Sequence, residues 1–474
     1  MNIEKIKEAK VLVIGDIMLD TYYIGNVKRI SPEAPVPIVN ISEQYNTLGG
    51  AANVAKNLIG LGSKVFVIGA VGEDSNGRLL KKEMTDINIK STLIQVEQQT
   101  INKIRIIGNN QQIARVDFEN DEMKLNANDE KCLIEAIEKQ IPLSDVVIIS
   151  DYGKGICNDE ICKSIISNAK KYNEQVIVDP KGIKWNKYSN ATIITPNLKE
   201  LSDISGFDLK NENEIIYNEA RKLIDTYKFK YVLVTRSDKG MTLVGKDTCN
   251  HINTEAIEVF DVSGAGDTVV AVLAAALSAD FNFLDAVTLS NKAASIVVGK
   301  KRTSPVLFNE LNQSLFKHEK IWNFATSFHL NNLLNFLHEQ NKKIVFTNGC
   351  FDIIHKGHIY YLREAKNLGD ILIIGLNSDD SIKRIKGPSR PVNNEEARAF
   401  VLDALEFVDY VVIFPEDTPY NLIKEIHPDV LVKGGDYNIK DIVGREFAKE
   451  TVTIKFQDGY SSSGIIKSLK DNEL

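Results

Sequence analysis

In the first half of the chain, the residues best suited to chemistry follow three small residues, Gly264, Ala265 and Gly266. The apolar stretch 268–280 comes next and predicts a helix. Backbone N–H groups at a helix start can bind an anion, because they lack intrahelical partners and the helix dipole favours negative charge there. Asp267 would repel a bound phosphate unless it had a task, and a natural task is to accept a proton from a hydroxyl that attacks a γ-phosphate. A stabilising charge in the first helical turn is an equally good interpretation of this residue alone.

Polar residues at two other expected strand ends suit a nucleotide. Asn197 and Glu200 are three residues apart, so they can share one face of a helical turn and offer oxygen ligands to Mg²⁺ or to its bound waters. This spacing is common on helices and is weak support by itself. Thr235 and Gly240 lie at the two ends of a segment that follows another strand, at the edge where parallel sheets bind nucleotides.

Residues near the N-terminus offer groups for a sugar. Asp16 and Asp20 follow the first expected strand, and Asn53 follows the glycine pair Gly49 and Gly50 at the start of a helix. Carboxylate and amide side chains exchange hydrogen bonds with sugar hydroxyls. For the two acids, ordinary turn chemistry is the alternative.

The second half of the chain carries a pair of histidines, His355 and His358, at the start of another expected helix. Two imidazoles beside free backbone amides suit a polyphosphate. Zinc is the competing interpretation, but no nearby cysteine or third histidine completes a ligand set. Near the C-terminus, three consecutive hydroxyl residues open a helix and can contact phosphates or cap that helix: Ser461, Ser462 and Ser463.

The elements that position these residues are short apolar runs that alternate with stretches of helical length, which is typical of α/β folds with buried parallel sheets. One series of runs lies within 11–235 and a second within 344–456. The more polar segments 21–42 and 92–118 alternate with period two and predict a small side sheet, either a lid over the carboxyl edge of the first sheet or an ordinary hairpin excursion. We expect a first domain at 1–318, a linker with a helix at 319–341 and a second domain at 342–474.

Composition excludes several classes of protein. The 474 residues include 57 Lys and Arg against 64 Asp and Glu, and the net charge of −7 argues against nucleic-acid binding. The longest apolar run, Val269–Leu277, is far shorter than the roughly 18 residues that a membrane helix needs, so no membrane insertion is expected. Five cysteines, odd in number and without a CxxC pair, suggest reduced thiols in a cytoplasmic enzyme.

The first half resembles the ribokinase-like carbohydrate kinases through GGAAN at 49–53, NLKE at 197–200 and DVSGAGD at 261–267. Ser263 stands where that family commonly has threonine. The resemblance implies a ribokinase-like domain with a small β lid that often also forms the dimer contact, and hence a homodimer. It implies that Asp267 is the catalytic base and that the three small residues before it form the anion hole. It further implies Mg·ATP at Asn197 and Glu200, adenine near Asn291, and the sugar at Asp16, Asp20, Gly49, Gly50 and Asn53.

Five basic residues lie in the two expected lid segments, and two or three of them can bind a phosphate that the sugar already carries: Lys103, Arg105 and Arg115 in one segment, Lys28 and Arg29 in the other. The guanidinium group in particular matches the geometry of phosphate oxygens. For each residue taken singly, a solvated lid face is the simpler interpretation.

The second half resembles the cytidylyltransferase-like nucleotidyltransferases through HKGH at 355–358, GLNSD at 375–379 and the serine run. Glycerol-phosphate cytidylyltransferases have Arg where Phe456 or Gln457 stands here, which leaves the choice of base open. The resemblance implies a Rossmann-like domain in which a phosphate oxygen attacks the α-phosphate of a nucleoside triphosphate. A phosphomonoester is largely dianionic near pH 7, so positioning and charge neutralisation suffice without a general base. The implied nucleotide site comprises the two histidines, the serine run and Asn348, Gly349, Phe351, Lys356, Asn377, Asp379 and Lys433.

The fused order, with RISPEAPVP at 29–37, RIIGNNQQIARVDFE at 105–119 and LVKGGDY at 431–437, resembles the bifunctional heptose-phosphate kinases/adenylyltransferases of lipopolysaccharide core synthesis. That resemblance implies phosphorylation of D-glycero-β-D-manno-heptose 7-phosphate at O1 with ATP, and adenylyl transfer to heptose 1-phosphate. A separate phosphatase must then remove the 7-phosphate between the two steps. A fused kinase–cytidylyltransferase for another sugar or polyol phosphate is the alternative enzyme, and a sensor or scaffold without turnover is the non-enzymatic one.

Overall fold

The computed structural model describes residues 3–455, apart from 110, 120–123, 255–258, 301–303, 317–319, 325–329, 331–332, 335–336, 339–340 and 436–437. The chain divides into two compact units, Met1–Asn312 and Gln313–Leu474, each with its own sheet. The predicted serine run at 461–463 lies outside the described residues.

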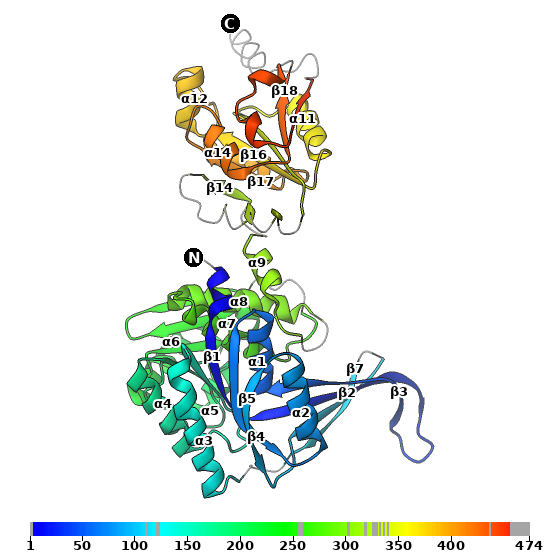
Figure 1. Ribbon diagram of the computed structural model, residues 1–474, viewed down its shortest axis with the longest axis vertical. Helices are drawn as coiled ribbons and strands as arrows, with labels where there is room; N and C mark the ends of the chain where they lie inside the picture. The colour runs from blue at the N-terminus through cyan, green and yellow to red at the C-terminus, as the bar shows by residue number, and fades with distance from the viewer. Residues whose placement is uncertain are drawn as a thin grey trace. The chain divides into compact units, whose positions relative to one another are not determined.

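The first unit is built on a nine-stranded sheet with the order β13-β12-β11-β10-β9-β8-β1-β4-β5 (Figure 1). The sheet is parallel from β5 to β11, and β12 and β13 add an antiparallel edge. The continuous apolar runs form these strands because both faces of the sheet are covered. The strands are β1 (Lys10–Gly15), β4 (Lys64–Gly72), β5 (Lys90–Val96), β8 (Val146–Ser150), β9 (Gln175–Asp179), β10 (Ile193–Ile194), β11 (Tyr231–Thr235), β12 (Met241–Gly245) and β13 (Cys249–Ile252).

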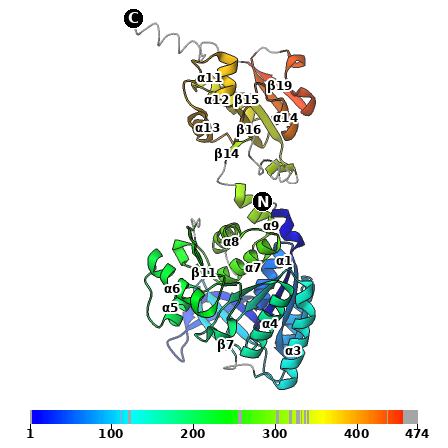
Figure 2. The same ribbon diagram turned by 90° about the vertical axis from the view of Figure 1, so that its left-hand side faces the viewer.

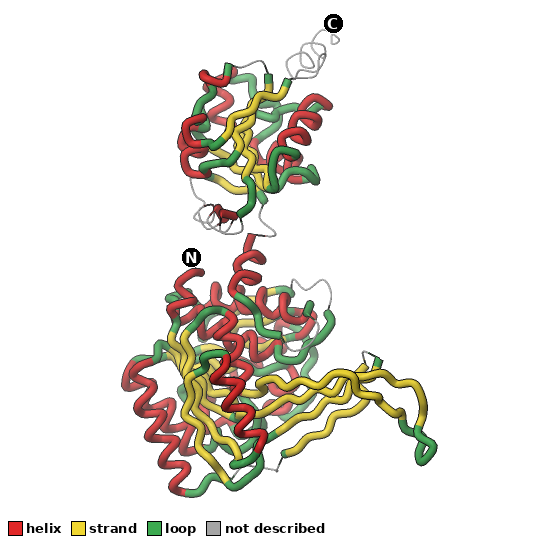
Figure 3. Tube along the Cα trace, turned by 45° about the vertical axis from the view of Figure 1, so that its right-hand side comes forward, coloured by secondary structure: helices red, strands yellow, loops and turns green. Residues whose placement is uncertain are grey.

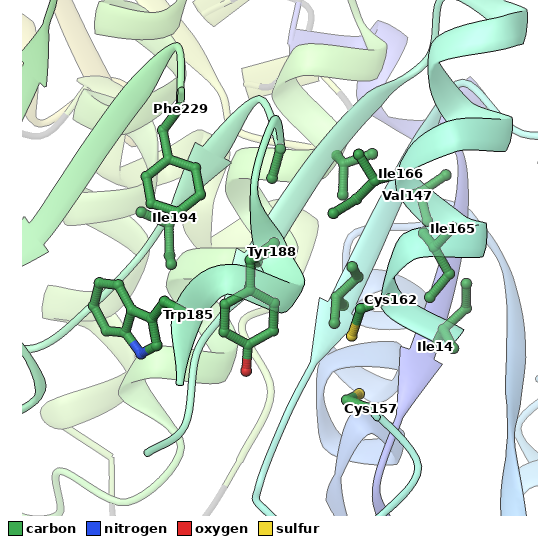
Figure 4. Close-up of a cluster of buried hydrophobic side chains, with 14 of the residues drawn as sticks. Ile14, Val147, Cys157, Cys162, Ile165, Ile166, Trp185, Tyr188, Ile194 and Phe229 are labelled. Atoms are coloured by element: carbon green, nitrogen blue, oxygen red, sulfur yellow. The ribbon is translucent and has the colours of Figure 1, made fainter. Parts of the chain in front are cut away.

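Helices cover both faces of this sheet (Figures 1 and 2). Helices α3, α4 and α6 pack on one face, while α7 lies against β1 and β8 on the other face and packs between α1 and α8. Figure 4 shows the core on the first face, where Trp185 and Tyr188 lie among the aliphatic side chains. The helices are α1 (Ala51–Gly60), α2 (Ser75–Asp86), α3 (Ala127–Gln140), α4 (Asp159–Tyr172), α5 (Leu198–Ser205), α6 (Asn213–Tyr227), α7 (Ala265–Ser278), α8 (Phe283–Val298) and α9 (Phe308–Phe316).

The longest apolar run of the sequence is buried inside this unit. Every side chain from Asp267 to Leu277 of α7 is buried, which explains a run that is apolar all round the helix. Among the described residues, no helix has the length and apolar character needed to cross a membrane.

A second, four-stranded sheet, the lid, has the order β3-β2-β6-β7 and extends away from the helices and the main sheet (Figure 3). Its strands are β2 (Ile17–Ile30), β3 (Pro37–Gly50), β6 (Asn102–Gly108) and β7 (Gln111–Phe118). The period-two segments therefore do form a side sheet. One part of the prediction is wrong: residues 92–96, expected in the lid, belong to β5 at the edge of the main sheet.

The second unit contains a six-stranded parallel sheet with the order β14-β17-β16-β15-β18-β19. Residues 321–323, which the sequence places in a linker, form its edge strand β14. Two apolar clusters cover the two faces of the sheet. The elements are β14 (Ile321–Asn323), β15 (Ile344–Gly349), α11 (Lys356–Lys366), β16 (Ile371–Asn377), α12 (Asp379–Lys386), α13 (Glu395–Asp403), β17 (Tyr410–Phe414), α14 (Tyr420–Ile426), β18 (Val430–Gly434) and β19 (Glu450–Ile454).

Both main sheets contain a topological switch point, where ligands bind in open α/β sheets. In the first unit the chain continues from β1 to β4 on one side and returns to β8 on the other. In the second unit it runs from β15 to β16 and β17, then returns to β18 on the opposite side of β15. The carboxyl ends of β1 and β15 are therefore the places to look for active sites.

Two candidate active sites

A cavity of about 420 Å³ lies at the carboxyl edge of the first sheet. It lies between the lid, which contributes β2 and β6, and the start of α7. The predicted residues that line it are Asp20, Gly50, Asn53, Lys103, Arg105, Asn197, Glu200, Thr235, Gly264, Gly266 and Asp267.

The start of α7 forms an open cradle at this cavity. Gly264 is the N-cap residue and has a φ of +79°, a left-handed conformation that glycine adopts without strain. A Cβ atom added at Gly266 would meet nothing within 4 Å, so there is open space beside the backbone of the first turn. The N–H of Ala265 donates to the backbone oxygen of Val262 at 3.2 Å. The two lining glycines still place a helix start beside the cavity, which fits an anionic group such as a phosphate.

Asp267 lies buried in the first turn of α7, and two donors hold its carboxylate. The hydroxyl of Tyr152 donates to Oδ1 at 2.5 Å, and Nδ2 of Asn53 donates to Oδ2 at 2.5 Å. Burial raises the pKa of Asp267 to about 6, although these two hydrogen bonds oppose the increase. The group is therefore ionised at pH 7, close to the pKa that suits a general base.

This pKa predicts the acid side of the kinase pH profile. Activity that needs ionised Asp267 should fall as the pH drops through about 6, because the protonated carboxyl cannot accept the substrate proton. The measurement is kcat/KM for sugar phosphorylation between pH 5 and 9 at fixed ionic strength. Activity that stays level down to pH 5, as expected for an aspartate with an unperturbed pKa, would contradict this assignment.

The lid contributes charged residues to the same cavity. Arg105 donates to Oδ1 of Asp20 at 2.6 Å, and Lys103 lies directly opposite Asp20 in the β2–β6 register. Gly49 leaves space for that carboxylate, because a Cβ there would lie 2.8 Å from Oδ2 of Asp20. Arg115 is not among the lining residues: it is half exposed and forms an ion pair with Asp117 on β7.

Asp16 is buried and is not among the residues that line the cavity. Its carboxylate accepts hydrogen bonds from the backbone N–H groups of Tyr152, Lys154 and Ile156 at 2.8, 3.0 and 3.1 Å. The structure therefore brings Asp20, but not Asp16, to the expected sugar site.

Asn197 and Glu200 form a capping box at the start of α5, with hydrogen bonds of 2.9 and 3.1 Å between each side chain and the other residue's N–H. Glu200 Oε1 also accepts from Lys181 at 3.1 Å, so these side-chain oxygens already have partners. Oxygen donors of this kind fit Mg²⁺ that is reached through water. Among the described residues, no group of three or more His, Cys, Asp or Glu is gathered to hold a metal without the nucleotide.

A second cavity, of about 510 Å³, adjoins the first and shares Thr235, Gly266 and Val269 with it. Its walls are largely apolar and include Gly240 and Asn291. An apolar cavity with a few polar groups fits an adenine base. Asn291 Nδ2 donates to the backbone oxygen of Asn253 at 2.8 Å, and this bond fixes the orientation of its amide.

In the second unit, the two predicted histidines lie side by side after β15. His355 is the N-cap residue of α11 without a capping side-chain bond, and its ring stacks on that of His358 at 4.0 Å. Burial lowers the pKa of both groups, to about 4 for His358, where the charges of His355 and Lys386 contribute further. Both imidazoles are therefore neutral at pH 7 and can each donate one N–H to an oxyanion.

Other predicted residues lie at the ends of β15 and β18, and among them the ring of Phe351 lies 5.4 Å from that of His358. Lys433 at the end of β18 donates to Oδ1 of Asn348 at 2.9 Å, and burial lowers its pKa. Gly349 is required by packing, because a Cβ there would lie 2.9 Å from the ring of Phe351, itself at a φ of +43°. Lys356 is the first residue of α11 and follows His355 in the chain.

Asn377 and Asp379, at the end of β16 and the start of α12, bond within the unit. Asn377 donates to Oγ of Ser381 at 3.0 Å, and Asp379 accepts from the fully buried Arg398 at 2.7 Å. Their observed contacts support the local structure rather than an open site.

Comparison with known proteins covers both units. The family model described as pfkB family carbohydrate kinase matches residues 8–308, and the model described as Cytidylyltransferase-like matches residues 346–468. The Bifunctional protein HldE of Aliarcobacter butzleri (strain RM4018) is 44% identical over 472 residues, 98% of each chain. The protein of the same name from Helicobacter acinonychis (strain Sheeba) is 45% identical over 467 residues, 97% of this chain and 98% of its own.

The chain belongs to the HldE family. It is therefore a bifunctional enzyme, a carbohydrate kinase followed by a nucleotidyltransferase, and the family resemblance predicted from the motifs is confirmed.

Solved structures agree with the expected fold. Phosphofructokinase-2 from Escherichia coli in complex with potassium superposes with a TM-score of 0.55 at 20% identity and covers 65% of this HldE-family chain and 97% of its own. Arabidopsis thaliana ribokinase complexed with ribose and ATP gives a TM-score of 0.51 at 20% identity, with 65% and 99% covered. At this identity the likeness shows the fold alone, and it confirms the predicted ribokinase-like class.

Among the residues that sequence reasoning missed in this HldE-family kinase cavity are Tyr152 and Asp179, which can donate or accept protons. Burial, together with the charges of Asp267 and Glu200, raises the pKa of Asp179 well above its usual range. Both residues follow apolar runs, β8 and β9, so the rule that carboxyl ends of parallel strands share one edge could have found them.

Proposed function

We propose that this chain phosphorylates D-glycero-β-D-manno-heptose 7-phosphate at O1 with ATP, and transfers an adenylyl group from ATP to heptose 1-phosphate. The products are ADP-heptose and pyrophosphate. The observation that carries the kinase half is the cavity in which Asp267 adjoins a phosphate cradle and two basic lid residues, Lys103 and Arg105. Family membership over nearly the whole chain and the three heptose-type sequence segments support the choice of sugar.

In the kinase reaction, the sugar O1–H loses its proton to Asp267 while O1 forms a bond to the γ-phosphorus and the bond to the ADP oxygen breaks. The amides at Gly264, Ala265 and Gly266 stabilise the charge on the phosphate oxygens. A magnesium ion bound with ATP would neutralise further charge, and Asn197 and Glu200 are placed to hold its waters. Asp20 and Asn53 orient the sugar hydroxyls from the other wall.

In the transferase reaction, the 1-phosphate oxygen of the sugar attacks the α-phosphorus of ATP and pyrophosphate leaves. His355 and His358 donate hydrogen bonds to the phosphates, and Lys433 and Lys356 supply positive charge. Asn348, Gly349, Phe351, Asn377, Asp379 and the serine run 461–463 belong to the proposed nucleotide site, with Asn377 and Asp379 acting through the local structure described above.

We propose that Lys103 binds the 7-phosphate of the sugar. Arg105 is already neutralised by Asp20, whereas among the described residues no carboxylate pairs with Lys103, whose ammonium lies 6.0 Å from the Tyr152 ring centroid. Lys103→Met should raise KM for the sugar 7-phosphate by about 10- to 100-fold, the effect of losing a charge-assisted hydrogen bond, and leave KM for ATP unchanged.

The matched control for that variant is Lys139→Met, which removes an exposed lysine on α3, outside the lid, and should leave both KM values unchanged. If the two substitutions change KM for the sugar 7-phosphate equally, a residue other than Lys103 binds the 7-phosphate.

The proposed pathway needs a second enzyme. A phosphatase that acts between the two steps must remove the 7-phosphate, because neither unit is of a hydrolase family.

We also propose a homodimer through the lid, which exposes large apolar side chains on both hairpins: Ile30, Val36, Ile41, Ile113, Val116 and Phe118. The five free cysteines support a cytoplasmic location.

The test of the proposed function is product analysis by mass spectrometry. Purified protein with heptose 7-phosphate, Mg²⁺ and ATP should give the 1,7-bisphosphate, and ADP-heptose once a phosphatase is added, even when CTP is present at the same concentration as ATP. A CDP-linked product formed in preference to ADP-heptose would instead establish the alternative, a kinase–cytidylyltransferase pair.

A further inference from the structure

The segment 151–156, which connects β8 to α4, is held by the buried carboxylate of Asp16, while Asp151 within the segment accepts from the N–H of Gly153 at 2.6 Å. Asp16 Oδ2 accepts from the N–H groups of Tyr152 and Lys154, and Oδ1 accepts from that of Ile156. Such a set of amide donors fixes the backbone path of the segment and thereby the position of the Tyr152 ring.

The backbone of Asp16 holds a second element of the site. Its carbonyl oxygen accepts from the N–H of Ala51 at 2.9 Å, at the start of α1 and two residues before Asn53. This close approach depends on Gly50, which has a φ of +59° and whose Cβ would lie 2.3 Å from the same oxygen. One residue therefore contacts both elements that carry the two hydrogen-bond donors to Asp267.

We propose that Asp16 and Tyr152 are positioning residues of the kinase site: Asp16 fixes the segment that carries Tyr152, and the Tyr152 hydroxyl orients Asp267 and keeps it ionised. Tyr152 and Asn53 together fix the plane of the carboxylate, which accepts the sugar proton on a remaining lone pair. This inference deepens the proposed function and assigns Asp16 a role other than direct contact with the sugar.

The surroundings of Asp267 support a donor role for Tyr152. Burial and the nearby Asp267 charge raise the pKa of Tyr152 well above its usual range, so its hydroxyl stays protonated and can only donate to the carboxylate. The other groups that face Asp267 are Asn53 on α1, Asp20 on β2, Lys103 on β6 and Asp179 on β9. Asp20 raises the pKa of Asp267 and Lys103 lowers it, while the Asp267 charge raises the pKa of Asp179.

The first experiment replaces Tyr152 by phenylalanine in the full chain. Without the hydroxyl, the ionised form of Asp267 loses a hydrogen bond, and the acid limb of kcat/KM should move up by about one pH unit. KM for ATP and the rate of adenylyl transfer should not change. Tyr361→Phe is the matched control, because it removes a buried hydroxyl of the second unit that bonds to Thr347, and it should leave the acid limb of the kinase in place.

The second experiment replaces Asp16 by asparagine, whose NH₂ group would face the Tyr152 and Lys154 donors in one orientation. Misplacing the segment should lower kcat by roughly 10- to 100-fold while KM for the sugar stays within about threefold. An unmoved acid limb in Tyr152→Phe overturns the role of Tyr152. A raised sugar KM with unchanged kcat in Asp16→Asn overturns the role of Asp16 and indicates a sugar contact. If the wild-type protein does not phosphorylate the heptose phosphate, the proposed function fails instead.

Discussion

Asp267→Asn should abolish sugar phosphorylation and leave adenylyl transfer intact. Asparagine keeps the shape of the side chain but cannot accept the proton of the attacking hydroxyl. General-base catalysis contributes about 10²- to 10⁴-fold, and we expect kcat to fall by that factor. The measurement is initial-rate ADP formation with the sugar phosphate at saturating ATP, with adenylyl transfer assayed on the same preparation.

Asp225→Asn is a suitable control for this variant, because Asp225 is an exposed acid on α6 whose carboxylate lies 3.7 Å from Arg221 in a surface ion pair. It should leave both activities unchanged. Kinase activity near the wild-type value in Asp267→Asn would remove this residue as the base.

His358→Ala should have the reverse effect and abolish adenylyl transfer alone. Its ring stacks on His355 at the start of α11, and we propose that it donates to an oxyanion of the triphosphate. Loss of one such preorganised donor costs about 10²- to 10³-fold in kcat. Pyrophosphate release from ATP in the presence of the sugar 1-phosphate measures this step.

His427→Asn is the matched control in the same unit, because His427 ends α14 at a φ of +45°, a conformation that asparagine tolerates. It should retain both activities. Loss of kinase activity in His358→Ala would contradict the independence of the two sites.

Local patterns in the sequence predicted the features that depend on neighbours along the chain. Local sequence marks where two helices begin. The small residues 264–266 with the buried run after Asp267 mark the start of α7, and the histidine pair marks the start of α11, as the structure confirms. Family membership then follows from their order along the chain.

Contacts between distant residues could not be predicted in this way. Asp16 was assigned to the sugar, yet its carboxylate is occupied by amides more than a hundred positions later, in the segment 152–156. Strand periodicity puts Lys103 and Arg105 on one face of the lid, and the register places Arg115 opposite Arg105. Only the tertiary structure shows that the first two reach the cavity while Arg115 pairs with Asp117.

Short edge strands are the other feature that pattern alone missed. The segment at β5 looks half polar because an edge strand has one neighbour, and β14 has only three residues in a polar stretch. β5 belongs to the first main sheet because it pairs with β4, and β14 belongs to the second because it pairs with β17. Local composition does not show such pairing.

The central claim is that one chain carries two separate active sites that act on successive forms of one sugar, and mixing the two inactive variants tests it most directly. Asp267→Asn and His358→Ala should each fail to make ADP-heptose from heptose 7-phosphate, ATP, Mg²⁺ and a phosphatase. An equal mixture of the two should restore its formation, because each variant supplies the site that the other lacks. A mixture that makes no ADP-heptose, although each variant retains its own remaining activity, would contradict the account.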